Sequence, residues 1–395
     1  MPGSSQTLAD RLAMLGTAVR APAARTAGWD GPAFEVRRNR RDAGEFFGRE
    51  QPHPADASAL FLDTETTGLA GGTGTTPFLV GLAFLADGEV VTEQYFLRRL
   101  SGEAAMLDAL RERLVAVETL VTFNGRRFDW PILEARGIIN RTPLEAPPEH
   151  HDLIGAARRL WYRPLGTYRL SVIERQVLGI DRTDDVDAAQ IPGLYLDYLR
   201  TGDAASLEPV FEHNRHDVLS LLHLRRKVRR WVEDGVDPPQ PVDWEGLGVL
   251  RLRAAAAALD GDTIGRALIG NAETALRRAL EAEDDPASRW RIASRLARLL
   301  RRAARWEELL ALWEHAAGVR GSWRVRTLIE VAKVQQRRLK QPAHAAAALE
   351  EAATVAEWLA ATGNPIATAL EDQVRARLVR LQQGAARPAA LRRGR

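Results

Sequence analysis

The segment LFLDTETTG, residues 60–68, carries the main structural signal in the sequence. It begins as a short apolar run, typical of a buried strand, and ends in a polar Thr-Thr-Gly turn. Alternate residues of a strand project from the same face, so Asp63 and Glu65 point in one direction. Two adjacent like charges cost free energy unless a cation lies between them, and oxygen ligands of this kind suit Mg²⁺ or Mn²⁺. The segment therefore predicts a buried strand with a carboxylate metal site; a surface pair at a strand end is the alternative.

Strand and helix patterns alternate on the C-terminal side of this segment. The apolar runs FLVGLAFL and VVTEQYFL, separated by ADGE, predict a hairpin. An amphipathic helix over 103–117, a strand at 119–123 and a helix closing at Gly137 follow. A further strand edge and helix precede one long helix over 207–233. This alternation favours an α/β layer fold, a mixed sheet flanked by helices.

A proline-rich stretch, DGVDPPQPVDWEG, ends this pattern and reads as a linker. Beyond it the sequence shows only helical stretches with short breaks, which predicts stacked helical hairpins. Their spacing of Trp, Leu and Ala resembles tetratricopeptide repeats. The predicted organisation is an N-terminal extension (1–56), an α/β domain (57–233), a linker (234–245), an all-α helical-repeat domain (246–385) and a basic tail (386–395).

The composition restricts the chemistry that the chain can perform. Cysteine is absent, which excludes disulfides, thiolate zinc sites and a cysteine nucleophile, so oxygen or imidazole must hold any metal. No run of about 18 apolar residues is present, so we expect no membrane span. The N-terminus lacks an apolar segment behind a basic start, so we expect no secretory signal and a cytoplasmic protein.

Charge is distributed unevenly along the chain. Residues 246–395 carry 26 basic and 16 acidic side chains, whereas residues 1–245 carry 29 basic and 36 acidic ones. Such asymmetry indicates a polyanionic partner, and salt-sensitive binding of nucleic acid by the C-terminal half is the expected consequence. The alternative is a genomic bias toward Arg and Ala, with no meaning for binding.

Two further motifs carry polar side chains at places suited to a site. Asn124 begins NGRRFD directly after a predicted strand, and Asp129 enters the following helix; the alternative reading is a helix cap. In HNRHD, His213 and Asp217 are four residues apart and share one helix face, whereas His216 is turned about 100° away. A solvated helix start is the alternative here. Asp152 is a weaker candidate for a further ligand.

The three motifs, taken in this order, resemble those of the DEDD 3′→5′ exonuclease superfamily, which has a ribonuclease-H-like fold. FLDTETTGLAGGTGT, LGTYRLSVIERQVLGI, IPGLYLDYLRTGD and FEHNRHDVLSL more narrowly resemble the YprB-like branch of predicted bacterial exonucleases. The resemblance covers about residues 58–230 closely. Members of that branch often carry tetratricopeptide-like helices behind the nuclease domain.

The resemblance implies a set of site residues. It makes Asp63, Glu65, Asp129 and Asp217 the carboxylates that bind two divalent cations, Mg²⁺ or Mn²⁺, about 4 Å apart around the scissile phosphate. In the superfamily a His five residues before the last Asp, or a Tyr four before it, is the general base. Here Glu212 stands five before and a His four before, so we assign His213 as the base and His216 as second choice. Residues assigned to substrate binding are Thr66, Thr67, Gly68, Asn124, Arg126 and Phe128.

The function expected from this set is a metal-dependent nuclease, an exonuclease that hydrolyses single-stranded DNA or RNA. A structure-selective endonuclease on the same fold is one alternative. A nucleic-acid-binding adaptor with a degenerate site, acting through its helical repeats, is another. The expected partners are single-stranded nucleic acid and, through the repeats, another protein; DNA or RNA preference stays open.

Overall fold

The computed structural model describes residues 31–48, 53–68, 74–182, 185–239, 241–257, 263–316 and 321–385. They divide into two compact units. The first unit takes residues 1–154 and 170–226, and the second takes residues 155–169 and 227–395. The chain therefore crosses between the units three times, whereas the sequence predicted one α/β domain followed by one helical domain.

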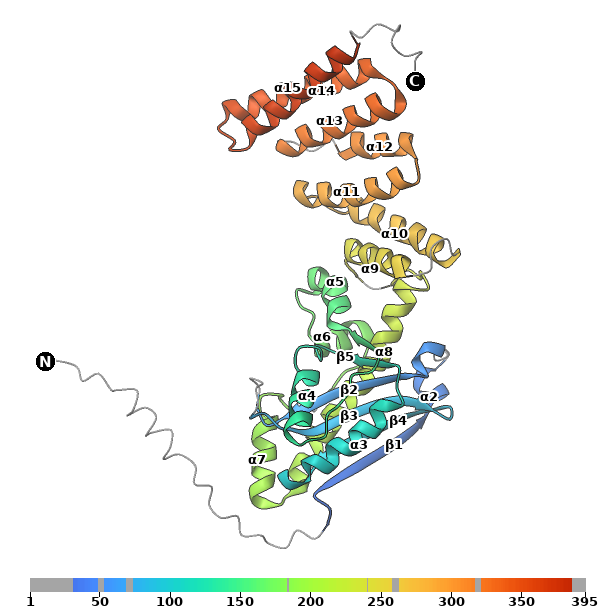
Figure 1. The fold of residues 1–395 in the computed structure, drawn as a ribbon, viewed down its shortest axis with the longest axis vertical. Coiled ribbons are helices and arrows are strands. Elements are labelled where there is room, and N and C mark those ends of the chain that lie inside the picture. The colour runs from blue at the N-terminus through green and yellow to red at the C-terminus, as the bar shows by residue number, and fades with distance from the viewer. Residues whose placement is uncertain are drawn as a thin grey trace, which may run out of the picture. The chain divides into compact units, whose positions relative to one another are not determined.

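A mixed sheet of six strands forms the centre of the first unit (Figure 1). The strand order is β1-β4-β3-β2-β5-β6. The strand β2 pairs antiparallel with β3 and parallel with β5, and β5 pairs parallel with β6. The mixed sheet agrees with the fold class predicted from the sequence. Its strands are β1 (Phe34–Asp42), β2 (Ala59–Thr66), β3 (Pro77–Ala86), β4 (Glu89–Leu97), β5 (Thr119–Thr122) and β6 (Glu149–Asp152).

The hairpin of β3 and β4 turns on two residues with positive φ. Asp87 has φ 52° and Gly88 has φ 79°, and the flanking Ala86 and Glu89 are partners in the antiparallel register. Two consecutive left-handed residues match the right-handed twist of the flanking strands, and Asp-Gly supplies them at low cost. The predicted hairpin is confirmed.

The N-terminal extension predicted over residues 1–56 contributes to the sheet. Its β1 pairs along its whole length with β4, and the short helix α2 (Ala43–Phe47) follows directly. The strand FEVRRNRRD was missed because it lies at the sheet edge, where most of its side chains are exposed and no apolar alternation marks it. Residues 1–30 of the extension lie outside the described residues.

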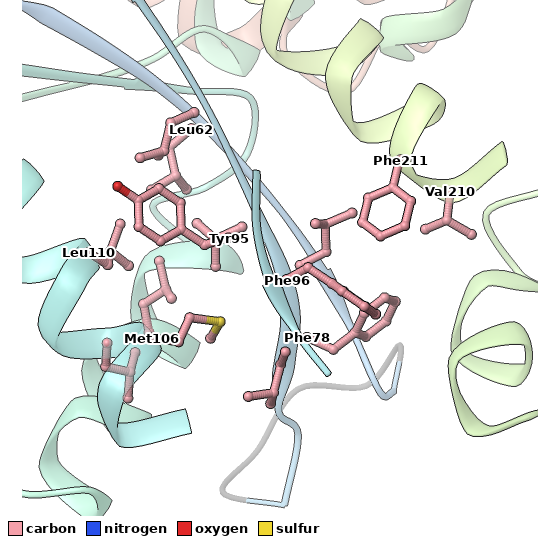
Figure 2. Close-up of a cluster of buried hydrophobic side chains, with 14 of the residues drawn as sticks. Leu62, Phe78, Tyr95, Phe96, Met106, Leu110, Val210 and Phe211 are labelled. Carbon is pink, nitrogen blue, oxygen red and sulfur yellow. The ribbon is translucent and has the colours of Figure 1, made fainter. Parts of the chain in front are cut away.

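Apolar side chains pack on both faces of the sheet. Figure 2 shows the neighbours Tyr95 and Phe96 on opposite sides of β4, as the two-residue repeat of a strand requires. Met106 of α3 (Glu103–Val115) lies on the Tyr95 side, and Phe211 of α8 (Glu208–Val232) lies on the other, with its ring 4.9 Å from that of Phe96. Both faces belong to one buried cluster. Helices therefore cover both faces of the sheet, and this packing fixes the distance of α8 from it.

The second unit is built from helices throughout its described part. From α9 to α15 each helix packs on the next, and two buried clusters run through the stack. Helices occupy the region where the sequence predicted only helical stretches with short breaks. The helices are α9 (Trp244–Ala257), α10 (Thr263–Glu281), α11 (Pro286–Arg302), α12 (Trp306–Ala316), α13 (Ser322–Val334), α14 (Pro342–Ala361) and α15 (Ala367–Ala385). The tetratricopeptide-like character of this stack stays a prediction.

The remaining helical elements complete the two units. The helix α5 (Ile154–Leu165) belongs to the second unit. The first unit adds α4 (Asp129–Ile139), α6 (Leu170–Ile173), a π-helical turn (Glu174–Leu178) and α7 (Ile191–Thr201); short 3₁₀ turns lie at Pro54–Asp56, Leu100–Gly102 and Ala204–Leu207, and a second π-helical turn lies at Gln335–Leu339.

The proline-rich segment between α8 and α9 is packed into the second unit. Arg251 of α9, 1% exposed, donates to the backbone oxygens of Trp231, Gly235 and Val236. Asp243 N–H donates to Leu160 O of α5. In the segment predicted to be a linker, a buried guanidinium thus satisfies backbone carbonyls at the end of α8 and just beyond it.

Two other sequence expectations concern the chain as a whole. None of the described helices is long and apolar enough to cross a membrane. The predicted basic tail, residues 386–395, lies outside the described residues.

Candidate active site

The central strand β2 presents two acidic side chains beyond the end of its parallel neighbour. The pairing of β2 with β5 ends at Phe61 and Val121, so Asp63 and Glu65 extend past β5. On the other side Asp63 lies opposite Gly81 of β3. Ligand sites of open α/β sheets lie at this kind of edge, outside the carboxyl ends of parallel strands. The two carboxylates therefore point into a space that loops from β5 and β6 can also reach.

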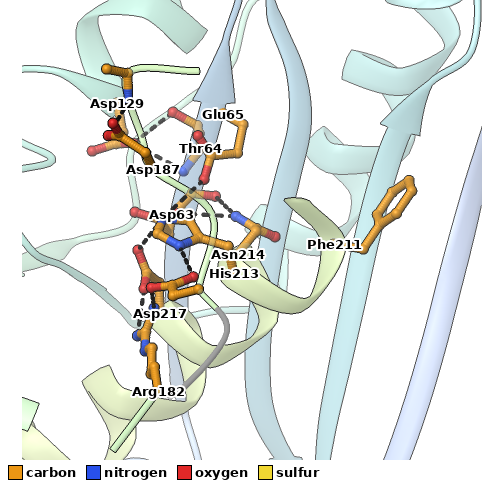
Figure 3. Close-up of polar contacts among 12 residues, drawn as sticks. Asp63, Thr64, Glu65, Asp129, Arg182, Asp187, Phe211, His213, Asn214 and Asp217 are labelled. Carbon is orange, nitrogen blue, oxygen red and sulfur yellow. Dashed lines mark hydrogen bonds and ion pairs between the residues drawn. The ribbon is translucent and has the colours of Figure 1, made fainter. Parts of the chain in front are cut away.

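Asp129 comes to the same place from the start of α4 (Figure 3). Its Oδ1 accepts a hydrogen bond of 2.6 Å from Thr64 Oγ1 and one of 3.1 Å from Thr64 N, which attaches α4 to the strand between Asp63 and Glu65. The intervening loop turns at Asn124, whose φ of 70° is left-handed, a conformation that Asn tolerates better than most residues. Thr64 thus joins the first two motifs.

Asp152 binds the backbone of this loop and does not join Asp63, Glu65 and Asp129. Its oxygens accept from the backbone N–H groups of Asn124, Arg126 and Ile154 at 2.7, 3.2 and 3.1 Å. Three N–H donors satisfy a carboxylate locally, as in an Asx turn. We therefore assign Asp152 to positioning the turn before Asp129, and not to ligation.

The helix α8 supplies the third motif and is fixed to β2 by Asn214. Asn214 is fully buried and donates from Nδ2 to Asp63 Oδ2 at 3.1 Å, while its Oδ1 accepts from Gln94 Nε2 at 3.1 Å. Gln94 Nε2 also donates to the carbonyl oxygen of Phe211, at 2.8 Å. This network sets the rotation of α8, so that the neighbouring His213 and the following Asp217 face the strand (Figure 3). Sequence reasoning missed Asn214 because a lone amide in a polar pentad gives no sign of burial.

Gly81 makes the close approach of α8 possible. A Cβ added at this residue would lie 2.1 Å from Asn214 Oδ1 and 2.7 Å from its Cγ, which real contacts do not show. We expect Gly81→Ala to displace Asn214 and to lower the turnover of the site by at least about tenfold, because small misplacements of catalytic groups have large effects. Steady-state kinetics at saturating metal measure this loss.

Gly88→Ala is the matched control for that substitution. Nothing lies within 4 Å of a Cβ added at Gly88, although its positive φ strains the turn. Its effect should therefore appear in stability and leave turnover per folded molecule near that of the unsubstituted protein. Equal turnover for Gly81→Ala would contradict the positioning role of Asn214.

His213 lies among three acidic side chains. Its Nδ1 is 2.6 Å from Asp185 Oδ1, and its Nε2 is 3.8 Å from Glu65 Oε1 and 3.7 Å from Asp217 Oδ2. Its side chain is 14% exposed, against 44% for His216, whose nearest acidic partner is Glu212 at 3.9 Å. Sequence periodicity predicted this difference in facing, and the structure agrees with it. Asp185 was not predicted, because nothing in TDDVD indicates which Asp turns inward.

Arg182 is the main residue that sequence reasoning missed. Its guanidinium is 2.6 Å from Asp217 Oδ1 and 3.3 Å from Asp185 Oδ2, and it also pairs with the buried Glu174. The side chain is 8% exposed. No motif signals this contact, because Arg182 belongs to the irregular segment between Leu178 and α7, and its partner lies 35 residues away.

Negative charge dominates this site. Burial, reinforced by the charges of Asp217, Asp129 and Glu65, raises the pKa of Asp63 well above its usual value. Burial and the charges of Asp217, Asp129 and Asp185 raise the pKa of Glu65 in the same direction. Burial also raises the pKa of Asp129 to about 6, although its hydrogen bonds from Thr64 oppose the change. The four carboxylates thus repel one another, and a cation among them would relieve that repulsion.

The four carboxylates suit a divalent cation in their chemistry, but not in their present geometry. All four side chains offer oxygen, the ligand that Mg²⁺ and Mn²⁺ prefer. Among the described residues, however, no three Asp, Glu or His side chains meet in the arrangement of a metal site. Arg182 occupies one oxygen of Asp217. The residues therefore fit a metal ion in chemistry, and binding it requires that the carboxylates draw closer together and that Arg182 gives up or shares Asp217.

Of the residues predicted to bind substrate, Thr66 and Thr67 close the turn that follows β2. Thr66 Oγ1 donates to Gly68 O at 2.8 Å, and Thr67 is bonded through its N–H and its hydroxyl to Thr76, both at 3.0 Å. Phe128 is 44% exposed directly before Asp129. Arg126 is exposed and donates to the backbone oxygen of His150. Their roles toward a substrate stay predictions.

Comparison with known proteins supports the superfamily. The family model described as RNase_H superfamily matches residues 60–229, and a fold of this class suggests a nuclease. The chain is 37% identical over 175 residues to "Uncharacterized protein YprB" of Bacillus subtilis (strain 168). This match covers 43% of the chain and 42% of the relative, so it spans less than half of either protein. These matches support a ribonuclease-H-like domain at the level of the superfamily.

Proposed function

We propose that the ribonuclease-H-like domain hydrolyses phosphodiester bonds of single-stranded nucleic acid, acting from the 3′ end, with two divalent cations held by Asp63, Glu65, Asp129 and Asp217. The observation that carries the proposal is the convergence of these four carboxylates from β2, α4 and α8. Burial, reinforced by their mutual repulsion, raises the pKa values of Asp63 and Glu65. Clustered carboxylates with raised pKa values are typical of functional sites.

The chain's own residues provide the positions for this reaction. When bound, divalent cations would lower the pKa of an attacking water and neutralise charge on the scissile phosphate and the leaving oxygen. In the neutral ring, a proton on Nδ1 of His213 that is donated to Asp185 leaves Nε2 as an acceptor that faces Glu65 and Asp217. His213 Nε2 is thereby placed to take a proton from a water at the carboxylates. Asn214 holds Asp63, and Thr64 holds Asp129, in fixed orientations.

A nucleic-acid-binding adaptor with a weak or inactive site is the second candidate. The observation in its favour is the ion pair of Arg182 with Asp217, in which a fixed cation replaces part of a metal's role. A structure-selective endonuclease uses the same carboxylates and differs only in the substrate that reaches them.

One assay separates these candidates. The protein is incubated with single-stranded and hairpin DNA and RNA, labelled at the 5′ or the 3′ end, with Mg²⁺, Mn²⁺ or EDTA. A ladder of shortening 5′-labelled strands together with release of the 3′ label as mononucleotide is the expected result. Internal cuts at hairpin junctions indicate the endonuclease, and intact but bound substrate indicates the adaptor.

Removing Arg182 should make divalent metal bind more tightly. In the double variant Arg182→Gln/Glu174→Gln the buried pair of Arg182 and Glu174 is removed as a unit, so Glu174 is not left as an unpaired buried charge. Asp217 then loses its competing cation, and we expect the Kd for Mn²⁺, measured by calorimetry, to fall by at least about tenfold.

Glu174→Gln alone is the control for this variant. It leaves Arg182 on Asp217 and should change the Kd for Mn²⁺ by less than about threefold. Equal metal affinity in the double variant and the unsubstituted protein would show that Arg182 does not compete with the ion.

A further inference from the structure

The helix α11 of the second unit carries a row of arginines along one side. Arg291, Arg295, Arg298 and Arg302 follow the spacing i, i+4, i+7, i+11, which places their side chains on one helical face. Arg301 lies next to this row and 3.7 Å from Glu330 of α13. A row of this length covers about three helical turns, so it presents an extended line of positive charge.

Two hollows border this row. The first has a volume of about 510 Å³ and is lined by Trp290, Trp313 and Glu330 beside the arginines. The second, of about 670 Å³, has an apolar lining that includes Leu252 and Ile269, and no acidic side chain. Arg295 and Arg298 line both hollows, so the two lie on either side of the same stretch of α11.

The positive charge of the row is only partly neutralised. Glu245 accepts hydrogen bonds from Arg291 at 2.9 and 2.7 Å and from Arg295 at 3.1 Å. For Arg298 and Arg302, no carboxylate lies within ion-pair distance among the described residues. Both are exposed. The hollows therefore combine apolar walls with arginines that have no carboxylate partner among the described residues.

An aromatic side chain lies next to this charge. The ring of Trp290 is 5.0 Å from that of Trp313 and 6.0 Å from that of Trp323, tilted by 33° and 35°. Trp313 is buried, whereas Trp290 is half-buried and lines the first hollow. A half-buried tryptophan that is held against neighbouring rings and lines a hollow offers a rigid surface for a planar group.

We propose that this face, formed by Arg295, Arg298, Arg302 and Trp290, binds single-stranded nucleic acid. The arginines contact successive phosphates, and a base stacks on Trp290. An acidic peptide would satisfy the arginines but makes no use of the aromatic surface, so the combined chemistry favours nucleic acid. This site lies in the second unit, and its binding of nucleic acid does not require that the carboxylate site hydrolyse anything.

Binding without turnover tests the proposal. The full-length protein is titrated in EDTA into fluorescein-labelled oligothymidylate and oligouridylate of about 20 nucleotides, and anisotropy gives the Kd at several salt concentrations. The variant Arg298→Gln/Arg302→Gln should weaken binding by about tenfold or more at low salt. The slope of log K against log salt should fall by about 1.4, since each phosphate contact on a single strand contributes about 0.7.

The control carries the same change of charge on another helix. Arg375→Gln/Arg380→Gln alters exposed side chains of α15 and should change the Kd by less than about twofold. Trp290→Leu keeps apolar volume in the core but removes the stacking surface, and should weaken binding by at least about fivefold at unchanged salt slope. Its melting temperature shows whether the fold is retained.

Two results would overturn the proposal. If both double variants bind equally well, the row on α11 is not the site. If a polyglutamate peptide displaces the oligonucleotide at equal charge concentration, the face recognises negative charge alone, and an acidic protein partner is the better occupant.

Discussion

We expect Asp63→Asn to abolish metal-dependent hydrolysis while the protein stays folded. Asp63 is central to the repulsion among the carboxylates. Asparagine has the same shape but no charge, so a bound cation would lose one negatively charged oxygen ligand. Loss of a single electrostatic contact to the reacting groups typically lowers turnover by about 10²–10³-fold. Loss of a residue that holds the metal should lower turnover by more than this. Turnover of a labelled single strand with Mn²⁺, followed in excess enzyme, measures the loss in the variant relative to the unsubstituted protein.

The same substitution should stabilise the protein when metal is absent. Because the folded-state pKa of Asp63 is raised, its carboxyl group is held protonated more readily in the folded than in the unfolded chain. Stability is then greatest below the unfolded pKa and is lost as pH rises through the folded pKa. Asp63→Asn removes this loss, so above neutral pH in EDTA its melting temperature should exceed that of the unsubstituted protein.

Added Mn²⁺ should reverse that order, because a ligand that binds only the folded state stabilises it. The unsubstituted protein gains melting temperature and the variant gains little. A variant that turns over normally would place the reaction elsewhere in the molecule.

We expect His213→Ala to lower turnover by about 10²–10⁴-fold with metal binding preserved. This is the range for loss of a positioned general base. The Nε2 atom of His213 lies 3.8 Å from Glu65 and 3.7 Å from Asp217, so a water at the carboxylates is within its reach. Mn²⁺ affinity by calorimetry separates loss of the base from loss of the metal.

His216→Ala is the matched control on the same helix. His216 is half-exposed, and burial together with the charge of Arg182 lowers its pKa. Its replacement by Ala should lower turnover by less than about threefold. Asp185→Asn should give an intermediate loss of turnover, because the Asp185 carboxylate lies 2.6 Å from Nδ1 of His213 and orients the ring. If His216→Ala is the more damaging change, the role belongs to His216; two mild effects would mean that neither histidine is the base.

The sheet and helices of the first unit could be read from the sequence because their patterns are local. The apolar strand before Asp63, the Asp-Gly turn and the long helix ending near Val232 each carry a period or a turn residue of their own. The edge strand β1 carries none, since its solvated arginines hide the alternation. The position of α5 in the second unit depends on contacts that no local pattern encodes.

The site shows the same division. The i, i+2 spacing on β2 and the i, i+4 spacing on α8 predicted that Asp63 and Glu65, and His213 and Asp217, share faces. The residues that hold those faces in place act across long sequence distances: Asn214 with Gly81, Thr64 with Asp129, and Arg182 with Asp217. Partners of this kind have no spacing rule, so only the structure reveals them.

The account as a whole is tested most directly by phosphodiester turnover of the purified full-length protein and Asp63→Asn side by side. A 5′-labelled single strand is incubated with Mn²⁺ or with EDTA, and the products are resolved at nucleotide resolution. The account predicts shortening of the strand by the unsubstituted protein with Mn²⁺ alone, and intact strand in the other three reactions. Equal shortening by both proteins, or shortening in EDTA, would contradict a metal-dependent nuclease built on these carboxylates.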